Sequence, residues 1–282
     1  MNIQPAPVKQ NVVSLYAAYL ARRLRPSSVR QYLNVVRIIH VESGFPNPCE
    51  DNWLLKTTLA GIDKVKGNSV ARKTPVTPEL LLKIYSLLDL SKVFDCMFWA
   101  AALVMFFCIL RKSNLFPNQK GSFDKDKQFV RSDFVCTESG VVMISIKWSK
   151  TNQCKSYTKC VKLFHCLNVL SPVTAIKGAF LLCKLPSSAP AFVSDSQGTP
   201  MTGSVFVKHF KYLVSMCGHD PSTYASHSFR RGAATWAMQC GVPSDIVKIM
   251  GDWKSNCYQS YIDQIPESTQ DKYRRLLMLR LP

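Results

Sequence analysis

An unbroken apolar stretch, from Cys96 to Leu110, is the feature that most constrains how this chain can fold. A helix that is apolar on every side is stable only where protein surrounds it or where it crosses a membrane. The stretch is shorter than the roughly 20 residues that a transmembrane helix needs. It therefore predicts a central buried helix, and it ends directly on a cation, Arg111.

The residues before this stretch predict a small all-helical module. Two helical patterns cover residues 12–43, with Ser27 or Ser28 placed to cap the second, and a third pattern covers residues 52–67. Gly, Pro, Ser and basic residues without an apolar period follow, which indicates a linker. Because 282 residues exceed the usual size of one domain, we expect a helical domain over residues 1–70, a linker over 71–75 and a second domain over 76–282.

The second domain changes character after Pro117. Residues 127–164 alternate polar with β-branched and aromatic residues, and Glu138-Ser139-Gly140 supplies a turn, so we expect a small antiparallel sheet with Lys150 near its second turn. Helical patterns return from Pro172 onward. The predicted fold class is therefore mainly α with a small antiparallel β-sheet.

The charge of the chain points to a polyanionic partner. Lys and Arg number 36 against 18 Asp and Glu, a formal net charge of +18. Nucleic acid is the first candidate; an anionic membrane surface and a basic surface kept for solubility are the alternatives. The 11 cysteines form no CxxC pair, so we expect reduced thiols of an intracellular protein rather than a zinc site. The N-terminus lacks the apolar stretch of a signal peptide, which argues against secretion.

The segment SHSFRRGAAT places His227 and Arg230 three residues apart on a predicted helix. This spacing puts both side chains on one helical face, from which they reach a single phosphate at the helix N-terminus. A structural His–Arg pair is the alternative. The same segment continues with the spacing of a helix-turn-helix, with Ala234 inward, Gly241 at the turn, and Ile246 and Ile249 on the second helix. That second helix offers few side chains for reading bases.

Five short motifs follow one another in a fixed order, and together they resemble the tyrosine recombinase and integrase family. The resemblance is closest to the recombinases of eukaryotic Crypton- and DIRS-type mobile elements. The motifs are LRKSNL with Arg111, WSKT with Lys150, HSFRRGAAT with His227 and Arg230, GDWKSN with Trp253, and YQSYI with Tyr261. The resemblance covers the whole chain and implies a helical, SAM-like core-binding domain followed by an α+β tyrosine recombinase catalytic domain.

The resemblance implies a site-specific DNA recombinase that cuts and rejoins double-stranded DNA through a covalent 3′-phosphotyrosine. The guanidinium groups of Arg111 and Arg230 suit the charge that grows on the non-bridging phosphate oxygens. Tyr261 would be the nucleophile, activated by nearby positive charge. Lys150 would protonate the departing 5′ oxygen. Because the phosphotyrosine keeps the bond energy, neither ATP, a metal nor another cofactor is implied.

The remaining two residues have supporting roles by resemblance. His227 would act as a base or as a hydrogen-bond donor to the phosphate. Trp253 would pack against the site and donate its indole N–H; it stands where the family more often has a second His, a replacement that the family tolerates. The chain departs from the commoner pattern at Asn114, where an acidic residue usually buttresses the site.

Each assignment has a structural alternative. Arg111 suits the C-terminus of a helix, where the helix dipole stabilises a cation by roughly 0.3–1 kcal/mol. Lys150 has lysine neighbours and is equally a solvated charge, and Trp253 is equally a core residue. Tyr258 lies one helical turn before Tyr261 and is the rival nucleophile.

The resemblance also implies partners. In the family, the N-terminal module and the catalytic domain clamp duplex DNA, and a face rich in arginine fits such a role. The arginines in question are Arg22, Arg23, Arg25, Arg30 and Arg37. The C-terminal segment carries Leu276, Leu277 and Leu279 and is expected to dock on a neighbouring protomer, which implies a homo-oligomer, a tetrameric synapse, on DNA. A eukaryotic mobile element further implies the nucleus, and no membrane.

Three hypotheses remain open from the sequence. The first is an active recombinase, the second a catalytically inactive, domesticated relative that still binds DNA, and the third a helix-turn-helix regulator. A metal-dependent nuclease is disfavoured because no acidic cluster accompanies the basic motifs.

Overall fold

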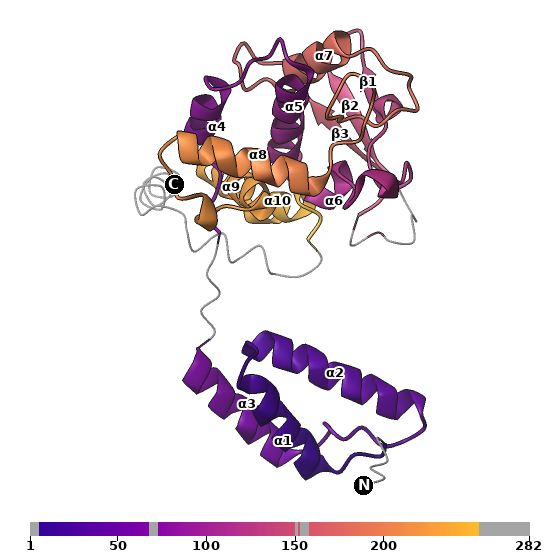
Figure 1. The fold of residues 1–282 in the computed structure, drawn as a ribbon, viewed down its shortest axis with the longest axis vertical. Helices are drawn as coiled ribbons and strands as arrows, with labels where there is room; N and C mark the ends of the chain where they lie inside the picture. Colours follow the sequence, from indigo (N-terminus) through magenta and orange to yellow (C-terminus); the bar gives the residue numbers. More distant parts are fainter. Residues whose placement is uncertain (1–5, 68–72, 150–151, 153–157, 254–282) are drawn as a thin grey trace, which may run out of the picture. The chain divides into compact units, whose positions relative to one another are not determined.

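The computed structural model describes residues 6–67, 73–149, 152 and 158–253. Two residues of the predicted site, Lys150 and Tyr261, lie outside the described residues, as do the rival nucleophile Tyr258 and the leucine-bearing C-terminal segment. The chain divides into two compact units, Met1–Ala71 and Arg72–Pro282 (Figure 1). Lys73 and Thr74, expected in the linker, bond to the backbone of the second unit: Lys73 Nζ donates to Ser222 O and Thr74 N to Thr223 O.

The N-terminal unit contains three helices in its described part, in the order that the sequence predicts. They are α1 (Gln10–Ala21), α2 (Pro26–Glu42) and α3 (Trp53–Lys66). Asn52 caps α3 by accepting a hydrogen bond from Leu55 N. The expected serine cap of α2 is wrong: the helix begins earlier, at Pro26, with Arg25 as N-cap. Proline favours the first helical position because its fixed φ suits the helix and it has no N–H to satisfy.

A small apolar core holds these three helices together. Its members come from all three helices and recur at helical spacing, which is why each helix is buried on one side only. They are Val13, Ala17, Ala21, Val29, Leu33, Leu55 and Ile62.

The second unit is built around the predicted apolar helix, α5 (Val93–Phe107), whose residues 96–106 are all buried. This helix packs most extensively against α7 (Pro172–Leu182), as Figure 1 shows. It ends at Phe107 rather than at Leu110, because Cys108–Leu110 turn away and Ile109 adopts a left-handed φ of 51°. Arg111 therefore does not end this helix; it is the N-cap of the next one, α6 (Lys112–Leu115).

A three-stranded antiparallel sheet follows α6, in the order β1-β2-β3. Its strands are β1 (Phe134–Cys136), β2 (Val142–Ile146) and β3 (Lys159–Leu163). Gly140, with φ 79°, supplies the first turn as predicted. Alternate residues of β2, namely Val142, Ile144 and Ile146, are buried, so the sheet presents one apolar face to the core.

Four further helices belong to the described part of this unit. They are α4 (Pro78–Tyr85), α8 (Gly203–Met216), α9 (Ser226–Gln239) and α10 (Ser244–Met250), with short 3-10 turns at η1 (Lys120–Ser122), η2 (Arg131–Asp133) and η3 (Pro221–Thr223). Of these, α9 packs against α5 and α10 against α9. Helix α9 also packs directly on the backbone of Val76, and a Cβ at Gly232 would overlap that backbone.

The predicted fold class, mainly α with one small antiparallel sheet, is confirmed. Across the described ranges, none of the helices combines the length and the apolar character that crossing a bilayer requires.

Candidate active site

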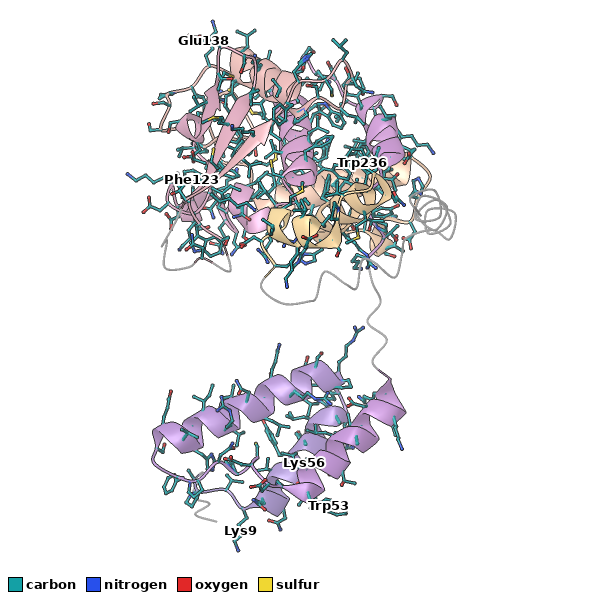
Figure 2. All side chains as sticks on the ribbon, turned by 180° about the vertical axis from the view of Figure 1, so that it is seen from behind. Lys9, Trp53, Lys56, Phe123, Glu138 and Trp236 are labelled. Carbon is teal, nitrogen blue, oxygen red and sulfur yellow. The ribbon has the colours of Figure 1, made fainter. Side chains whose placement is uncertain are left out.

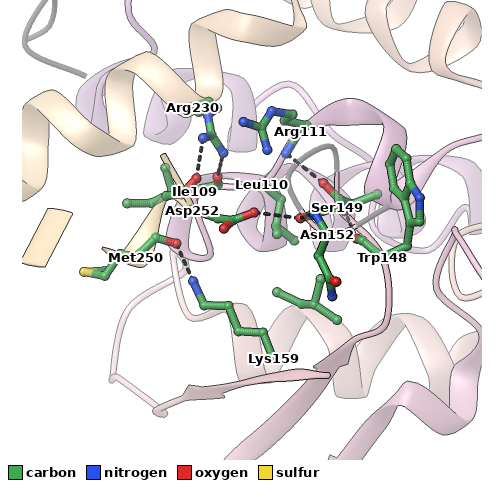
Figure 3. Close-up of a pocket in the computed structure, with 13 residues that line it drawn as sticks. Ile109, Leu110, Arg111, Trp148, Ser149, Asn152, Lys159, Arg230, Met250 and Asp252 are labelled. Carbon is green, nitrogen blue, oxygen red and sulfur yellow. Dashed lines mark hydrogen bonds between the residues drawn. The ribbon is translucent and has the colours of Figure 1, made fainter. Parts of the chain in front are cut away.

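A narrow pocket in the second unit brings together segments that are far apart in the sequence (Figure 3). Its walls come from the turn after α5, the start of α6, the end of β2 and the connection after it, the start of β3, one residue of α9, and the end of α10. Its cationic lining residues are Arg111, Lys159 and Arg230. Two of the six residues predicted from the sequence, Arg111 and Arg230, therefore meet in one place.

Arg230 is buried, with 3% of its surface exposed. Its guanidinium donates to two backbone carbonyls, that of Ile109 at 2.6 Å and that of Gly251. Its Cζ lies 4.0 Å from the ring centroid of Trp253, which is itself 7% exposed. A buried charge is stable only when hydrogen bonds replace its lost hydration; the two carbonyls and the aromatic face provide that replacement. Arg230 is thus held in one orientation.

Arg111 is positioned by Asn114, the residue at which the chain departs from the commoner family pattern. The backbone N–H of Arg111 donates to Asn114 Oδ1 at 3.2 Å, and Asn114 Nδ2 donates to Trp148 O at 2.7 Å. The amide therefore ties the start of α6 to the end of the β2 strand region. A carboxylate accepts hydrogen bonds but cannot donate the second one, so asparagine has a positioning role of its own here. Figure 3 shows the Arg111 and Arg230 side chains on the same side of the pocket.

Lys159, the first residue of β3, is a pocket residue that the sequence reasoning missed. Its Nζ donates to the carbonyls of Ile249 and Met250, at 2.9 and 3.0 Å, and Figure 3 shows the bond to Met250. Burial lowers the pKa of this ammonium, and the nearby Asp252 carboxylate partly opposes that effect. No local pattern distinguishes Lys159 from its neighbouring lysines. Only the pairing of β3 with β2 and the packing of α10 bring it into the pocket.

Three successive carbonyls at the end of α10 therefore accept hydrogen bonds from cations. Lys159 donates to the first two, and Arg230 donates to that of Gly251. The C-terminus of a helix carries partial negative charge and unpaired carbonyls, so cations are favoured there. This arrangement anchors the chain immediately before Trp253.

A second connection joins this anchored segment to the loop after β2. Ser149 Oγ donates to Asp252 Oδ2 at 2.7 Å and accepts from Asn152 N at 3.1 Å. Asp252 adopts a left-handed φ of 54°. Lys150, the predicted proton donor, follows Ser149 in the sequence. Neither Ser149 nor Asp252 was expected from the sequence.

His227 and Arg230 differ in their surroundings although both belong to α9. His227 is exposed in the first turn, whereas Arg230 is buried in the pocket, which His227 does not line. The helix-turn-helix spacing is present in α9 and α10, with Gly241 at the turn. Ala234 is buried, as expected, and Ile246 and Ile249 lie on α10, where they are 42% and 66% exposed and Val247 is the buried residue.

Within the described residues, no group of three or more His, Cys, Asp or Glu side chains is placed to hold a metal ion. The chemistry that the pocket itself offers is electrostatic. Two guanidinium groups and one ammonium line it together with one carboxylate, that of Asp252, and the excess of positive charge suits a phosphate group.

Comparison with solved structures identifies the fold. A variant of the Tn1549 transposon integrase in complex with transposon right end DNA is similar over 99% of this chain and 87% of its own, with 17% identity and a TM-score of 0.62. The XerH site-specific recombinase in a post-cleavage complex with palindromic difH matches 94% of this chain and 72% of its own, with 14% identity and a TM-score of 0.63. This chain has the tyrosine recombinase fold. XerA recombinase is a further similar structure, at 13% identity and a TM-score of 0.52, covering 97% of this chain and 90% of its own.

In sequence, no protein-family model and no curated protein matches the chain. The likeness to recombinases is therefore a likeness of fold. Within that fold, the pocket that contains Arg111 and Arg230 is the candidate active site.

Proposed function

We propose that this chain is a site-specific DNA recombinase that cuts and rejoins double-stranded DNA through a 3′-phosphotyrosine. The observation that carries the proposal is the meeting of Arg111 and Arg230 in one pocket, although they lie on different elements and far apart in the sequence. Recombinases of the same fold are seen bound to DNA, as the Tn1549 integrase and XerH complexes are.

The two arginines would bind the scissile phosphate. Negative charge grows on its non-bridging oxygens as the nucleophile approaches, and guanidinium groups keep their charge at any physiological pH. Arg230 is already oriented by two carbonyls and by the Trp253 ring, which reduces the reorganisation needed at the moment of reaction. Trp253 would support Arg230 and close one side of the site.

The proposed reaction exchanges one phosphoester bond for another. The Tyr261 oxygen attacks phosphorus, its proton passes to a base for which His227 is the candidate, and the bond from phosphorus to the 5′ oxygen breaks. Lys150 would give that oxygen its proton. The product is a 3′-phosphotyrosine and a free 5′ hydroxyl, and attack by a 5′ hydroxyl reverses the step. Neither ATP nor a metal ion takes part.

The proton donor has a second candidate in Lys159. A general acid works best when its pKa lies close to the working pH, and burial lowers the pKa of Lys159. Its ammonium is, however, hydrogen-bonded to two carbonyls of α10, which favours a positioning role. We therefore keep Lys150 as the donor, and the substitutions Lys150→Ala and Lys159→Ala separate the two. A substrate whose 5′ oxygen is replaced by sulfur needs no proton donor, so it should restore cleavage only to the variant that lacks the acid.

The decisive test is covalent trapping on duplex DNA that carries a nick next to the cleavage point, with mass mapping of the modified residue. We expect the label on Tyr261, loss of trapping in Tyr261→Phe, and retained DNA binding. Tyr258→Phe is the matched control, because it removes one hydroxyl from the same segment. A label on Tyr258 would reassign the nucleophile, and trapping that EDTA abolishes would overturn the metal-free mechanism.

The remaining assignments form part of the same proposal. The chain would act in the nucleus as the recombinase of a Crypton- or DIRS-type element and assemble as a tetramer on two DNA sites. A domesticated, inactive relative is the alternative function; it would bind the same DNA and give no covalent product with any nicked substrate. A helix-turn-helix regulator is disfavoured, because α10 exposes Ile246, Ile249 and Met250 and offers only Ser244 and Asp245 as exposed polar side chains, too few to read base edges.

A further inference from the structure

A cleft of about 530 Å³ opens in the N-terminal unit, where α1 turns into α2. Six residues line it: Tyr19, Leu20, Arg22, Arg23, Leu24 and Tyr32. Leu20 and Leu24 are partly buried and pack against the core of this unit, so the apolar part of the cleft is anchored by folded structure. The other four residues supply aromatic rings and cations.

The two tyrosines are unusually accessible for aromatic residues. Tyr19 is 65% exposed and Tyr32 is 50% exposed. In the described part of the N-terminal unit, no aromatic ring stacks on either of them, whereas the second unit contains many such ring pairs. Their faces are therefore open to a flat ligand that has a π-surface.

The arginines of this unit differ in what they contact. Arg30 is paired with Asp63, at 3.1 Å between Nη1 and Oδ1, and Arg37 Nε donates to Asn34 Oδ1 at 3.0 Å. The side chains of Arg22 and Arg23 are exposed and make no hydrogen bond or ion pair with any described residue. No acidic residue lines the cleft. Its two cations are thus available to an anionic ligand.

We propose that this cleft binds an unpaired nucleotide of single-stranded DNA. The base would stack on a tyrosine ring, and Arg22 and Arg23 would bind the flanking phosphates. Aromatic rings interleaved with cations are the general means of holding a single strand, because every base has a π-face. In a duplex each base face is covered by the neighbouring bases. A duplex would therefore contact the arginines through its phosphates and would not stack on the tyrosines.

The inference concerns a different site and ligand from the proposed strand transfer, and it holds whether or not Tyr261 is a nucleophile. Its function would be to hold a strand that has separated from its complement while the chain is bound to DNA. Covalent trapping on a nicked duplex tests the recombinase, whereas equilibrium binding to a single strand tests the cleft. A negative result in one experiment therefore does not contradict the other proposal.

The experiment measures binding of the full chain to a single-stranded oligonucleotide that contains 2-aminopurine, whose fluorescence is quenched by stacking. We expect quenching on binding, and its loss in Tyr19→Ala or Tyr32→Ala with affinity about 5- to 150-fold weaker, the range that corresponds to one stacked base. Tyr→Phe at the same position retains the ring and should retain the affinity. The double variant Arg22→Ala/Arg23→Ala should bind more weakly and show a shallower salt dependence.

Matched controls come from α3, outside the cleft. Trp53, which is 73% exposed, and Lys56 are both labelled in Figure 2; Trp53→Ala removes an exposed ring, and Lys56→Ala with Lys64→Ala removes two charges. Both controls should bind the single strand like wild type. The proposal is overturned if the tyrosine variants, shown by circular dichroism to be folded, keep quenching and affinity, or if they weaken duplex binding by the same factor.

Discussion

Ser149 and Asp252 are joined by a hydrogen bond of 2.7 Å across 103 residues of sequence. One belongs to the connection between β2 and β3, and the other lies between α10 and Trp253. The bond therefore couples the loop that carries Lys150 to the segment that leads to the two candidate tyrosines.

A double-mutant cycle tests this coupling. Ser149→Ala and Asp252→Ala should each destabilise the protein by about 1–3 kcal/mol, since each removes a partly buried hydrogen bond to a charged group. The double variant should cost less than the sum, with a coupling of about 0.5–3 kcal/mol. Asp252→Asn should be milder than Asp252→Ala, because asparagine still accepts a hydrogen bond and tolerates the left-handed φ. Urea unfolding measures all four; strictly additive effects would contradict the coupling.

Gly251→Ala should displace Trp253 from Arg230. A Cβ at this position would overlap the Trp253 ring, so the ring must move away from the guanidinium. We expect the free energy of unfolding to decrease by about 1–3 kcal/mol, as for other overpacked sites, and the tryptophan fluorescence to change. The matched control is Gly178→Ala in α7, where a Cβ meets no atom within 4 Å. That control should be neutral or stabilising by up to about 1 kcal/mol, and an equal loss in both variants would refute the steric explanation.

Asn114→Asp should lower the stability of the protein, although it introduces the acidic residue that is commoner in the family. The carboxylate would still accept from the Arg111 N–H, but it would face the Trp148 carbonyl with no proton to donate. We expect a loss of about 1–3 kcal/mol, comparable to that of Asn114→Ala, and reduced covalent trapping because Arg111 is no longer positioned. Thermal unfolding provides the measurement. A stability equal to or above wild type would show that the donated bond to Trp148 does not matter.

His209 makes the second unit sensitive to mild acid. Burial lowers the pKa of this imidazole between Phe94 and Phe98, and the Asp95 carboxylate at 3.4 Å only partly opposes that effect. The folded state therefore binds fewer protons than the unfolded state, so stability is full above the unfolded pKa of about 6.5 and decreases as the pH falls below it. Lowering the pH from about 7.5 to about 5.5 should reduce the urea midpoint more in wild type than in His209→Gln, because glutamine does not titrate in this range. Equal shifts in the two proteins would contradict this assignment.

Local patterns in the sequence predicted most of the fold. The unbroken apolar stretch predicted α5, and alternation with a turn at Gly140 predicted the β1–β2 hairpin. Both depend on the immediate neighbours of each residue, because helix and strand periods decide which side chains share a face. The errors occurred at boundaries, where Pro26 began α2 before the expected serine caps and Ile109 turned the chain before Arg111.

The candidate site was predicted only in part, for a physical reason. Arg111 and Arg230 were identified because fixed guanidinium charges suit a phosphate and because their motifs resemble those of recombinases. Helical spacing placed His227 on the face of Arg230, but spacing says nothing about depth, and only Arg230 is buried.

Local sequence establishes the chemical groups that are available: strong positive charge, two arginines in motifs that resemble those of recombinases, and elements whose type follows from local periodicity. Which of these groups come into contact depends on tertiary packing. Lys159 reaches the end of α10, Asn114 joins Arg111 to Trp148, and Ser149 reaches Asp252. These contacts depend on the packing of α5, α9, α10 and the sheet around one core, and packing is a property of surfaces brought together from distant segments, which no local pattern encodes.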